Sequence, residues 1–261
     1  MSKFAVMNEV KHDFLPIVKV IEEAYEIPQL GATRKISALL PYDYEYSNKR
    51  YPVLYMQDGQ NLFNPHAPYG DWAIDRSLAR LAAQGFHDII VIAVDHGEEE
   101  RIKEYSPYEH NELGIGQGHC YVEFLKTKLI PYVNKEYRVK ASPKYTGIGG
   151  SSMGGLISLY AGLTEPEVFG KMMIFSPSLW ISPMIFEDAA QYMPMPQSKL
   201  YLYAGGRESI QHLPNIKKLE MVMRTKPYFE FNLSVDMEGQ HQEYYWSREF
   251  PEAVKWLYFN N

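Results

Sequence analysis

The fold is decided by the stretch Tyr145-Thr146-Gly147-Ile148-Gly149-Gly150-Ser151-Ser152-Met153-Gly154-Gly155. A short β-type run precedes its two serines, and apolar side chains follow at helical spacing, at Leu156, Leu159, Tyr160 and Leu163. Glycines flank the junction, where only small residues let the backbone reverse without a clash. The stretch therefore predicts a strand, a sharp turn at Ser152 and a helix that packs on a sheet through one apolar stripe.

The turn also carries a chemical pattern. Gly150-Ser151-Ser152-Met153-Gly154 matches G-x-S-x-G, whose serine is a nucleophile exposed between a strand and a helix. Glycine-rich turns of this kind also occur as packing turns or as phosphate cradles. A dinucleotide-binding G-x-G-x-x-G fits only with Ser152 in its last position, and no Walker lysine follows. We therefore interpret Ser152 as a candidate nucleophile.

The composition is that of an ordinary globular protein. Of 261 residues, 46% are hydrophobic and 22% are charged, and no linker rich in Pro, Gly or Ser divides the chain. We expect one domain over residues 1–261, with a small cover segment at 180–197 that is rich in proline and methionine. The net charge of -6 provides no basic face, so nucleic acid is not an expected partner.

The sequence favours a cytoplasmic protein. Residues 1–10 lack the apolar run of a signal peptide, and no segment has the apolar length of a membrane span, so no membrane partner is expected. The single cysteine, Cys120, cannot form an internal disulfide and fits a reducing compartment. Because Cys120 begins an apolar helical pattern and lacks a motif, we interpret it as a structural thiol. The oligomeric state is not specified by the sequence.

Strand and helix patterns alternate after an initial antiparallel pair of strands at 18–26 and 33–40. Further strands are predicted at 52–57, 88–95, before Ser152, and at 171–176, 199–204 and 230–237. Helices are predicted at 73–83, 121–137 with a kink at Pro131, after Ser152, and at 210–224 and 247–259, while 96–118 is expected to be an irregular functional loop. This order predicts an α/β fold with a mostly parallel eight-stranded sheet and helices on both faces, in which Ser152 follows the fifth strand.

A serine hydroxyl becomes a strong nucleophile when a histidine removes its proton and a carboxylate orients that histidine. In α/β-hydrolase folds the chain order is serine, acid, histidine. Only His212 and His241 follow Ser152. His241 lies in a loop directly after the last strand, whereas His212 falls within a predicted helix and is expected to face solvent. His241 is therefore the candidate base.

Two carboxylates compete for the role of the acid. Glu208 follows the seventh strand in a turn with two glycines, and Asp236 lies near the end of the eighth strand, five residues before His241. We favour Glu208, because an acid after the seventh strand fits the logic of the fold, and Asp236 stays open as the alternative. Glu187 and Asp188 are expected to be surface charges.

Two backbone amides are candidates for an oxyanion hole. One is the amide of Met153, directly after the serine. The other is the amide of Gln60 in the loop Asp58-Gly59-Gln60-Asn61 after the third strand, and Asp58 is expected to brace that loop.

Other candidate binding residues are fewer. The aromatic residues of predicted loops near the site are Tyr108, Trp180, Tyr244, Tyr245 and Trp246, of which Trp180 is our candidate for substrate binding. His110, Glu112, His119 and Cys120 lie close together in the chain without a regular ligand spacing, so no metal site is predicted.

Three parts of the chain together resemble the putative esterase family of α/β-hydrolases. They are Tyr51-Pro52-Val53-Leu54-Tyr55-Met56-Gln57-Asp58-Gly59-Gln60-Asn61-Leu62-Phe63, residues 150–155 and residues 238–241. The family includes S-formylglutathione hydrolases, enterochelin-type siderophore esterases, feruloyl esterases and mycolyltransferases, and the similarity extends from residue 34 to residue 257. The resemblance implies a serine ester hydrolase without a cofactor. An aspartate is common at the acid position of α/β-hydrolases, so Glu208 would be a departure that adds one methylene of reach.

These observations lead to three functional hypotheses. The first is a carboxylesterase that hydrolyses short-acyl or aromatic-acid esters of small molecules through Ser152, His241 and Glu208 and an acyl-enzyme intermediate. The second is an acyltransferase with the same triad, in which an alcohol replaces water. The third is a binding protein that retains the hydrolase fold without catalysis, which predicts the loss of a catalytic residue.

Overall fold

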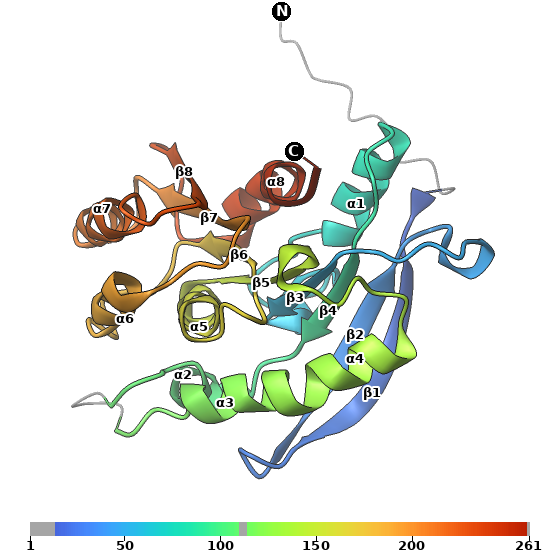
Figure 1. Ribbon diagram of the computed structural model, residues 1–261, viewed down its shortest axis with the longest axis horizontal. Coiled ribbons are helices and arrows are strands. Elements are labelled where there is room, and N and C mark those ends of the chain that lie inside the picture. The colour runs from blue at the N-terminus through green and yellow to red at the C-terminus, as the bar shows by residue number, and fades with distance from the viewer. Residues whose placement is uncertain (1–13, 110–113, 260–261) are drawn as a thin grey trace, which may run out of the picture.

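The computed structural model describes residues 14–109 and 114–259, and its central feature is a sheet of eight strands (Figure 1). Their order in space is β1-β2-β4-β3-β5-β6-β7-β8. The strands are β1 (Ile17–Ile27), β2 (Ala32–Leu40), β3 (Val53–Gln57), β4 (Ile90–Val94), β5 (Thr146–Ser151), β6 (Lys171–Phe175), β7 (Ser198–Gly205) and β8 (Phe229–Asp236). Pairing is antiparallel from β1 to β2 and from β2 to β4, and parallel between all other neighbours. The predicted mostly parallel α/β sheet is confirmed, and Ser152 follows the fifth strand.

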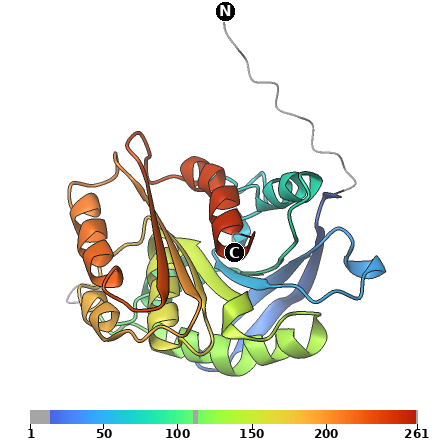
Figure 2. The ribbon, with the colours of Figure 1, turned by 45° about the horizontal axis from the view of Figure 1, so that its top comes forward.

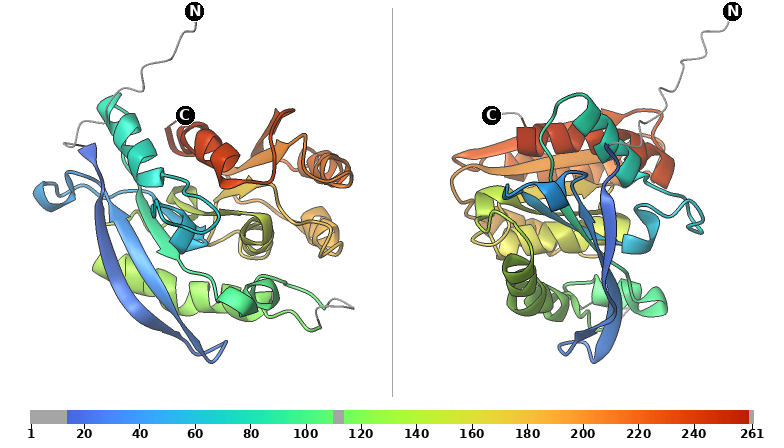
Figure 3. Two further views of the ribbon diagram at one scale, coloured as in Figure 1. Left: turned by 180° about the vertical axis from the view of Figure 1, so that it is seen from behind. Right: turned by 90° about the vertical axis from the view of Figure 1, so that its right-hand side faces the viewer.

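Helices cover both faces of this sheet, as Figures 1 and 3 show. One face carries α1 (Ile74–Ala83) and α8 (Glu243–Val254), which lie side by side (Figure 2). The other face carries α3 (Gly118–Phe124), α4 (Ile130–Glu136), α5 (Ser152–Thr164), α6 (Ile185–Gln191) and α7 (His212–Met223). Side chains alternate between the faces of a strand, so Tyr55 of β3 packs in one apolar core and its neighbour Met56 packs in the other.

The helix α5 is buried more completely than a single apolar stripe predicts. The predicted residues Leu156, Leu159 and Leu163 are buried, but so are Ser158 and Ala161. The helix lies against β5 and β6 and also contacts α3 and α6, so it is enclosed by the sheet and by other helices. Its start at Ser152 is thereby fixed relative to the centre of the sheet.

The stretch 96–118 differs from the sequence prediction of an irregular loop. It contains the short helix α2 (Arg101–Glu104) and the first residue of α3. Ion pairs from Arg101 to Asp58 and from Glu104 to Arg34 hold both ends of α2. A helix stabilised by such tertiary contacts needs no apolar periodicity, which explains why the pattern did not predict it.

Two helices also differ from their predicted form. The helix predicted at 121–137 is interrupted by a π-helical turn, Leu125–Leu129, directly before Pro131, which lacks a backbone N–H. The closing helix begins at Glu243 rather than at residue 247 and ends in a second π-helical turn, Lys255–Phe259. Trp246 is therefore a buried residue in the first turns of α8, not an aromatic side chain of a loop.

Several sequence predictions concern residues outside the described ranges. The N-terminal segment examined for a signal peptide, His110 and Glu112 belong to this group. In the two described ranges, no helix is both long and apolar enough to cross a bilayer.

Replacing Gly150 with alanine should destabilise the fold at the junction of β5 and α5. The new Cβ would lie 2.9 Å from the backbone carbonyl atoms of Gly154, which cannot move without displacing the helix. We expect a loss of about 1–3 kcal/mol in the free energy of unfolding, measured by urea denaturation. Thr164→Ala, at the exposed last residue of α5, is the control, because it introduces no atom into the core. An equal or smaller loss for Gly150→Ala would show that the junction tolerates a side chain.

Candidate active site

Ser152 occupies a strained turn between β5 and α5. Its backbone φ is 57°, in the left-handed region that residues other than glycine seldom adopt. Gly150 and Gly154 touch through their backbones across the turn, because a Cβ on Gly150 would lie 2.9 Å from Gly154. This geometry presents the side chain of Ser152 at the carboxyl edge of the sheet, as the G-x-S-x-G pattern predicts.

Two cavities meet at Ser152. The larger one has a volume of about 1050 Å³, and the smaller one has a volume of about 500 Å³. Ser152, His241 and Gln242 line both cavities. The hydroxyl of Ser152 lies 3.3 Å from the hydroxyl of Ser178, whose backbone N–H donates to the Ser152 carbonyl at 3.0 Å. The serine therefore has open space on two sides, as an ester with an acyl and an alcohol half requires.

Glu208 lies in a buried, donor-rich position after β7. One carboxylate oxygen, Oε1, accepts hydrogen bonds from the Ser176 hydroxyl at 2.6 Å and from the Gly205 N–H at 2.8 Å. The other, Oε2, lies 2.6 Å from Nδ1 of His241. Burial alone would raise the pKa of Glu208, but the hydrogen bonds from His241 and Ser176 and the positive charge available on nearby histidines lower it below its ordinary value. The carboxylate is therefore held in its ionised form.

The ring of His241 contacts the carboxylate of Glu208 and not the hydroxyl of Ser152. Its side chain is 43% exposed, and its Nδ1 faces the carboxylate, which leaves Nε2 for the cavity. In the part of the chain that the structure describes, no hydrogen bond joins His241 to Ser152, although both line the same two cavities. Such bonds are often long without a substrate and shorten when one binds.

Asp236, the alternative acid, has different partners. Its Oδ1 accepts the backbone N–H of Glu238 at 3.0 Å, and its carbonyl accepts the N–H groups of Gly206 and Gly239 at 2.8 and 2.9 Å. These bonds close the turn after β8. Asp236 is thus the last residue of β8, directly before the loop that carries His241, while the carboxylate that contacts the His241 ring is that of Glu208.

His212 is not solvent-facing, and this prediction was wrong. The imidazole is 8% exposed, and its Nε2 lies 3.4 Å from Oε2 of Glu208. Burial lowers the pKa of His212, while the charge of Glu208 opposes that shift. His212, the first residue of α7, faces the turn that carries Glu208 four residues earlier in the chain, a local polar contact that apolar helical periodicity does not encode.

The two predicted oxyanion donors occupy different surroundings. Met153 is the second residue of α5, so its amide is among the N–H groups that lack a partner within the helix. The side chain of Gln60 contacts the 96–98 segment, where its Oε1 accepts the N–H of His96 at 3.0 Å and its Nε2 donates to Glu98 at 3.4 Å. Gln60 is not among the residues that line either cavity, whereas its neighbours Asp58 and Asn61 line the larger one.

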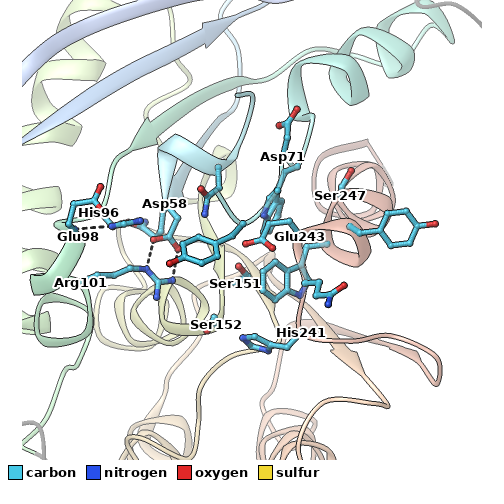
Figure 4. A pocket seen from close by; sticks show the side chains of 18 of the residues that line it. Asp58, Asp71, His96, Glu98, Arg101, Ser151, Ser152, His241, Glu243 and Ser247 are labelled. Atoms are coloured by element: carbon cyan, nitrogen blue, oxygen red, sulfur yellow. Dashed lines mark hydrogen bonds and ion pairs between the residues drawn. The ribbon is translucent and has the colours of Figure 1, made fainter. Parts of the chain in front are cut away.

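Asp58 braces the loop of Gln60 through an ion pair. Its two carboxylate oxygens accept Nε and a terminal nitrogen of Arg101 at 2.7 and 2.8 Å. Asp58 has a φ of 58°, and a Cβ on Gly154 would lie 2.6 Å from its carboxylate. The loop after β3 therefore packs directly on the start of α5, and Figure 4 shows the pair of Asp58 and Arg101 on the cavity wall.

The larger cavity carries more negative than positive side chains. Its carboxylates are Asp58, Asp71, Glu98, Glu99 and Glu243, and Arg101 is its guanidinium (Figure 4). Arg101 is already engaged by Asp58, and burial raises the pKa values of Asp71 and Glu243. Raised pKa values favour the neutral acids, so the negative character of the lining rests chiefly on Asp58, Glu98 and Glu99 and is partly offset by Arg101.

The smaller cavity contains the predicted substrate-binding residue. Trp180 is 61% exposed and lines it together with Pro177 and Ser178. Of the other aromatic candidates, Tyr244 lines the larger cavity, whereas the hydroxyl of Tyr108 donates to Asp188. Asp188 is thus a half-buried partner of Tyr108 rather than a free surface charge.

Within the described residues, no group of three or more His, Cys, Asp and Glu side chains is arranged to hold a metal ion. Cys120 is half-buried in α3, and its Sγ lies 3.3 Å from Nε2 of His119. This position agrees with the interpretation of Cys120 as a structural thiol.

Sequence reasoning missed Arg101 and Ser176. Ser176 directly follows β6, and side chains after parallel strands gather at one edge of a sheet, so its position was a usable signal. No comparable signal marks Arg101, because its partner Asp58 is distant in the chain.

Comparisons with known proteins agree with this geometry. The sequence profile of the family described as Putative esterase matches residues 27–257. The protein YbbA of Bacillus subtilis is 28% identical in an alignment that covers 88% of this chain and 95% of YbbA.

Solved structures share the fold. An IroE-like serine hydrolase from Shewanella oneidensis has a TM-score of 0.70 at 19% identity, covering 91% of this chain and 78% of its own. S-formylglutathione hydrolase (FrmB) from Staphylococcus aureus has a TM-score of 0.65 at 18% identity, covering 93% of this chain and 97% of its own. The chain therefore belongs to the Putative esterase family and shares the α/β fold of these hydrolase structures.

Proposed function

We propose that the protein is a carboxylesterase that works through Ser152, His241 and Glu208. The observation that carries the proposal is the 2.6 Å contact between Nδ1 of His241 and Glu208, at a cavity that Ser152 also lines. A carboxylate in this position selects the tautomer whose Nε2 can accept a proton, and it stabilises the charged imidazole that follows. The strained turn at Ser152 supplies the exposed hydroxyl.

In the first half-reaction, Oγ of Ser152 attacks the ester carbonyl carbon while Nε2 of His241 takes the hydroxyl proton. The tetrahedral intermediate then collapses, the bond to the alcohol oxygen breaks, and His241 returns the proton to that oxygen. The products are a free alcohol and an acyl group on Ser152. We assign the amides of Met153 and Gln60 to the developing oxyanion; for Met153 the support is its place in the first turn of α5.

In the second half-reaction, water replaces the alcohol. His241 takes a proton from water, the hydroxyl attacks the acyl carbon, and the proton passes to Oγ of Ser152 as the carboxylic acid leaves. An alcohol acceptor in place of water would make the protein an acyltransferase. The two cavities at Ser152 leave room for either nucleophile, so we keep acyl transfer as the second candidate.

We propose short-acyl or aromatic-acid esters of small molecules as substrates. The smaller cavity, with the exposed ring of Trp180, has room for a short or flat group. We propose that residues 180–197, of which Trp180 lines this cavity, form its cover within one catalytic domain. The carboxylates of the larger cavity add a charge requirement, because a negatively charged substrate group would be repelled there.

Hydrolysis of a panel of p-nitrophenyl and aromatic-acid esters tests the proposal. We expect turnover of acetate, butyrate and aromatic-acid esters, and a rate about tenfold lower for hemisuccinate esters, whose free carboxylate enters a negative cavity. Ser152→Ala should lower kcat/KM by about 10³-fold or more, because no other group forms the acyl-enzyme. Ser151→Ala is the matched control, since Ser151 ends β5 beside the nucleophile.

Equal activity in Ser152→Ala would remove Ser152 as the nucleophile, and faster turnover of long-chain esters would contradict the substrate class. Added alcohols that capture the acyl group in preference to water would identify a transferase. A native protein that neither hydrolyses an ester nor reacts with a fluorophosphonate at Ser152 would favour the non-catalytic binding protein.

The choice of acid is tested by Glu208→Gln against Asp236→Asn. Glu208→Gln should lower kcat by about 10²–10⁴-fold, because an amide no longer stabilises the charged imidazole. Asp236→Asn keeps the Oδ1 acceptor for the N–H of Glu238, so we expect kcat within about threefold of native. The reverse order would assign the role to Asp236.

The pH dependence of unfolding provides a second check on Glu208. Because its folded pKa is lowered, the ionised carboxylate stabilises the native protein above its unfolded pKa of about 4.3. This stabilisation is lost as the pH falls through the folded value. The difference in unfolding free energy between native protein and Glu208→Gln should therefore shrink on acidification below pH ~4.

A further inference from the structure

Ser176 occupies an unusual position directly after β6. The residue is fully buried and has a backbone φ of 43°. Its hydroxyl has two partners, the Nε1–H of Trp246 at 3.0 Å and Oε1 of Glu208 at 2.6 Å. The left-handed backbone at Ser176 therefore aims a small hydroxyl between the first turns of α8 and the carboxylate that contacts His241.

The direction of these two hydrogen bonds is fixed by chemistry. An indole N–H can only donate, so Trp246 must donate to the oxygen of Ser176. A serine hydroxyl carries one proton, and with its lone pair occupied by Trp246 that proton is free to point to Glu208. A directed chain thus runs from Trp246 through Ser176 to Glu208 and on to Nδ1 of His241.

This series of hydrogen bonds sets the orientation of the Glu208 carboxylate. Oε1 receives the Ser176 hydroxyl and the Gly205 N–H, so only Oε2 is left to face His241. Two donors on one oxygen fix the plane of the carboxylate and favour its ionised form. Without Ser176, Oε1 would keep one donor, and the carboxylate could rotate away from the imidazole.

Trp246 also contacts the imidazole of His241 directly. The two ring centroids lie 5.0 Å apart with the planes at 88°, an edge-to-face arrangement. Trp246 is itself 3% exposed and packs against Trp72, which stacks on Phe175. One rigid side chain therefore restrains the candidate base by contact and the candidate acid through Ser176.

We propose that Ser176 and Trp246 are positioning residues that act as one unit, setting the orientation of the His241 and Glu208 pair for catalysis. The inference rests on the proposed function, because it assigns these residues to the same Ser152 site. Neither residue touches the reacting atoms. If their bonds served stability alone, the folded protein would work equally well without them, and the experiment separates these two roles.

The experiment compares Ser176→Ala, Ser176→Gly, Trp246→Phe and the double variant Ser176→Ala/Trp246→Phe. Glycine tolerates the backbone of Ser176, so a loss shared by both Ser176 variants comes from the missing hydroxyl rather than from strain. Phenylalanine keeps a ring against His241 but removes the N–H. The controls are Ser158→Ala, a fully buried serine of α5, and Trp256→Phe, whose ring packs on Tyr201.

We expect each Ser176 variant to lower kcat by about 10-fold to 100-fold, the effect of losing a hydrogen bond to a charged group. KM for a p-nitrophenyl ester should stay within about threefold, because the hydroxyl that is removed is engaged by Trp246 and Glu208, although Ser176 also lines the smaller cavity. Trp246→Phe should lower kcat less than the Ser176 variants do. The double variant should lower kcat no more than Ser176→Ala alone, since both residues act through the same series of hydrogen bonds. The controls should keep native kcat.

A readout that needs no substrate completes the test. The Nδ1–H of His241 should give a far-downfield proton resonance, assigned by its loss in His241→Gln. We expect the resonance to shift or broaden in the Ser176 variants and to stay unchanged in both controls and in Ser152→Ala. Folded Ser176 variants with native kcat and a native resonance would overturn the proposal. A native protein without esterase activity would contradict the proposed function, while the resonance would still decide whether Ser176 and Trp246 orient the pair.

Discussion

The rest of the site depends on one close contact, the approach of the backbones of β5 and α5 at Ser152. A Cβ on Gly150 would lie 2.9 Å from the backbone of Gly154, and a Cβ on Gly154 would lie 2.6 Å from the carboxylate of Asp58, so neither position has room for a side chain. The contact forces Ser152 into its left-handed conformation and brings the loop after β3 against the start of α5. Nucleophile, helix N-terminus and loop are thus set by one packing constraint, and not by three independent ones.

Parallel pairing of the strands then brings the remaining side chains of the site to the same edge of the sheet. The strands β5, β6, β7 and β8 are consecutive neighbours, and their carboxyl ends share one edge. Ser152, Ser176, Glu208 and His241 each lie in the segment that follows one of these four strands, in the same order. Neighbouring strands lie about 4.8 Å apart, so side chains after successive strands fall within hydrogen-bonding reach. The chain order of serine, acid and histidine is the spatial order of the strands.

This relation explains which features the sequence could predict. The order of strands along the chain and the motifs that follow the strands predict that Ser152, Glu208 and His241 lie together. This prediction needs only local sequence patterns and the rule that parallel strands end at one edge. The burial of Trp246 and the helix α2 depend on contacts between distant segments, whereas His212 turns inward toward Glu208, only four residues earlier, through a local contact that the apolar pattern does not register. Trp246 illustrates the difference, since its indole is fixed by Ser176 and Trp72, both far away in the chain. No periodicity within residues 240–250 contains that information.

The carboxylates around the site show how surroundings set chemical roles. Glu208 and Glu243 are the same residue type and both lose solvent on folding, yet the pKa of Glu208 is lowered and that of Glu243 is raised. The side chain of Glu208 receives donors from Ser176, Gly205 and His241, whereas at Glu243 desolvation outweighs one backbone hydrogen bond and the charge available on His241. Burial therefore disfavours the ionised form of both carboxylates. At Glu208 the hydrogen-bond donors outweigh this effect of burial. In the mechanism that we propose, the acid has to stay ionised to stabilise a transient imidazolium, so the donors on Glu208 would be as necessary there as the carboxylate itself.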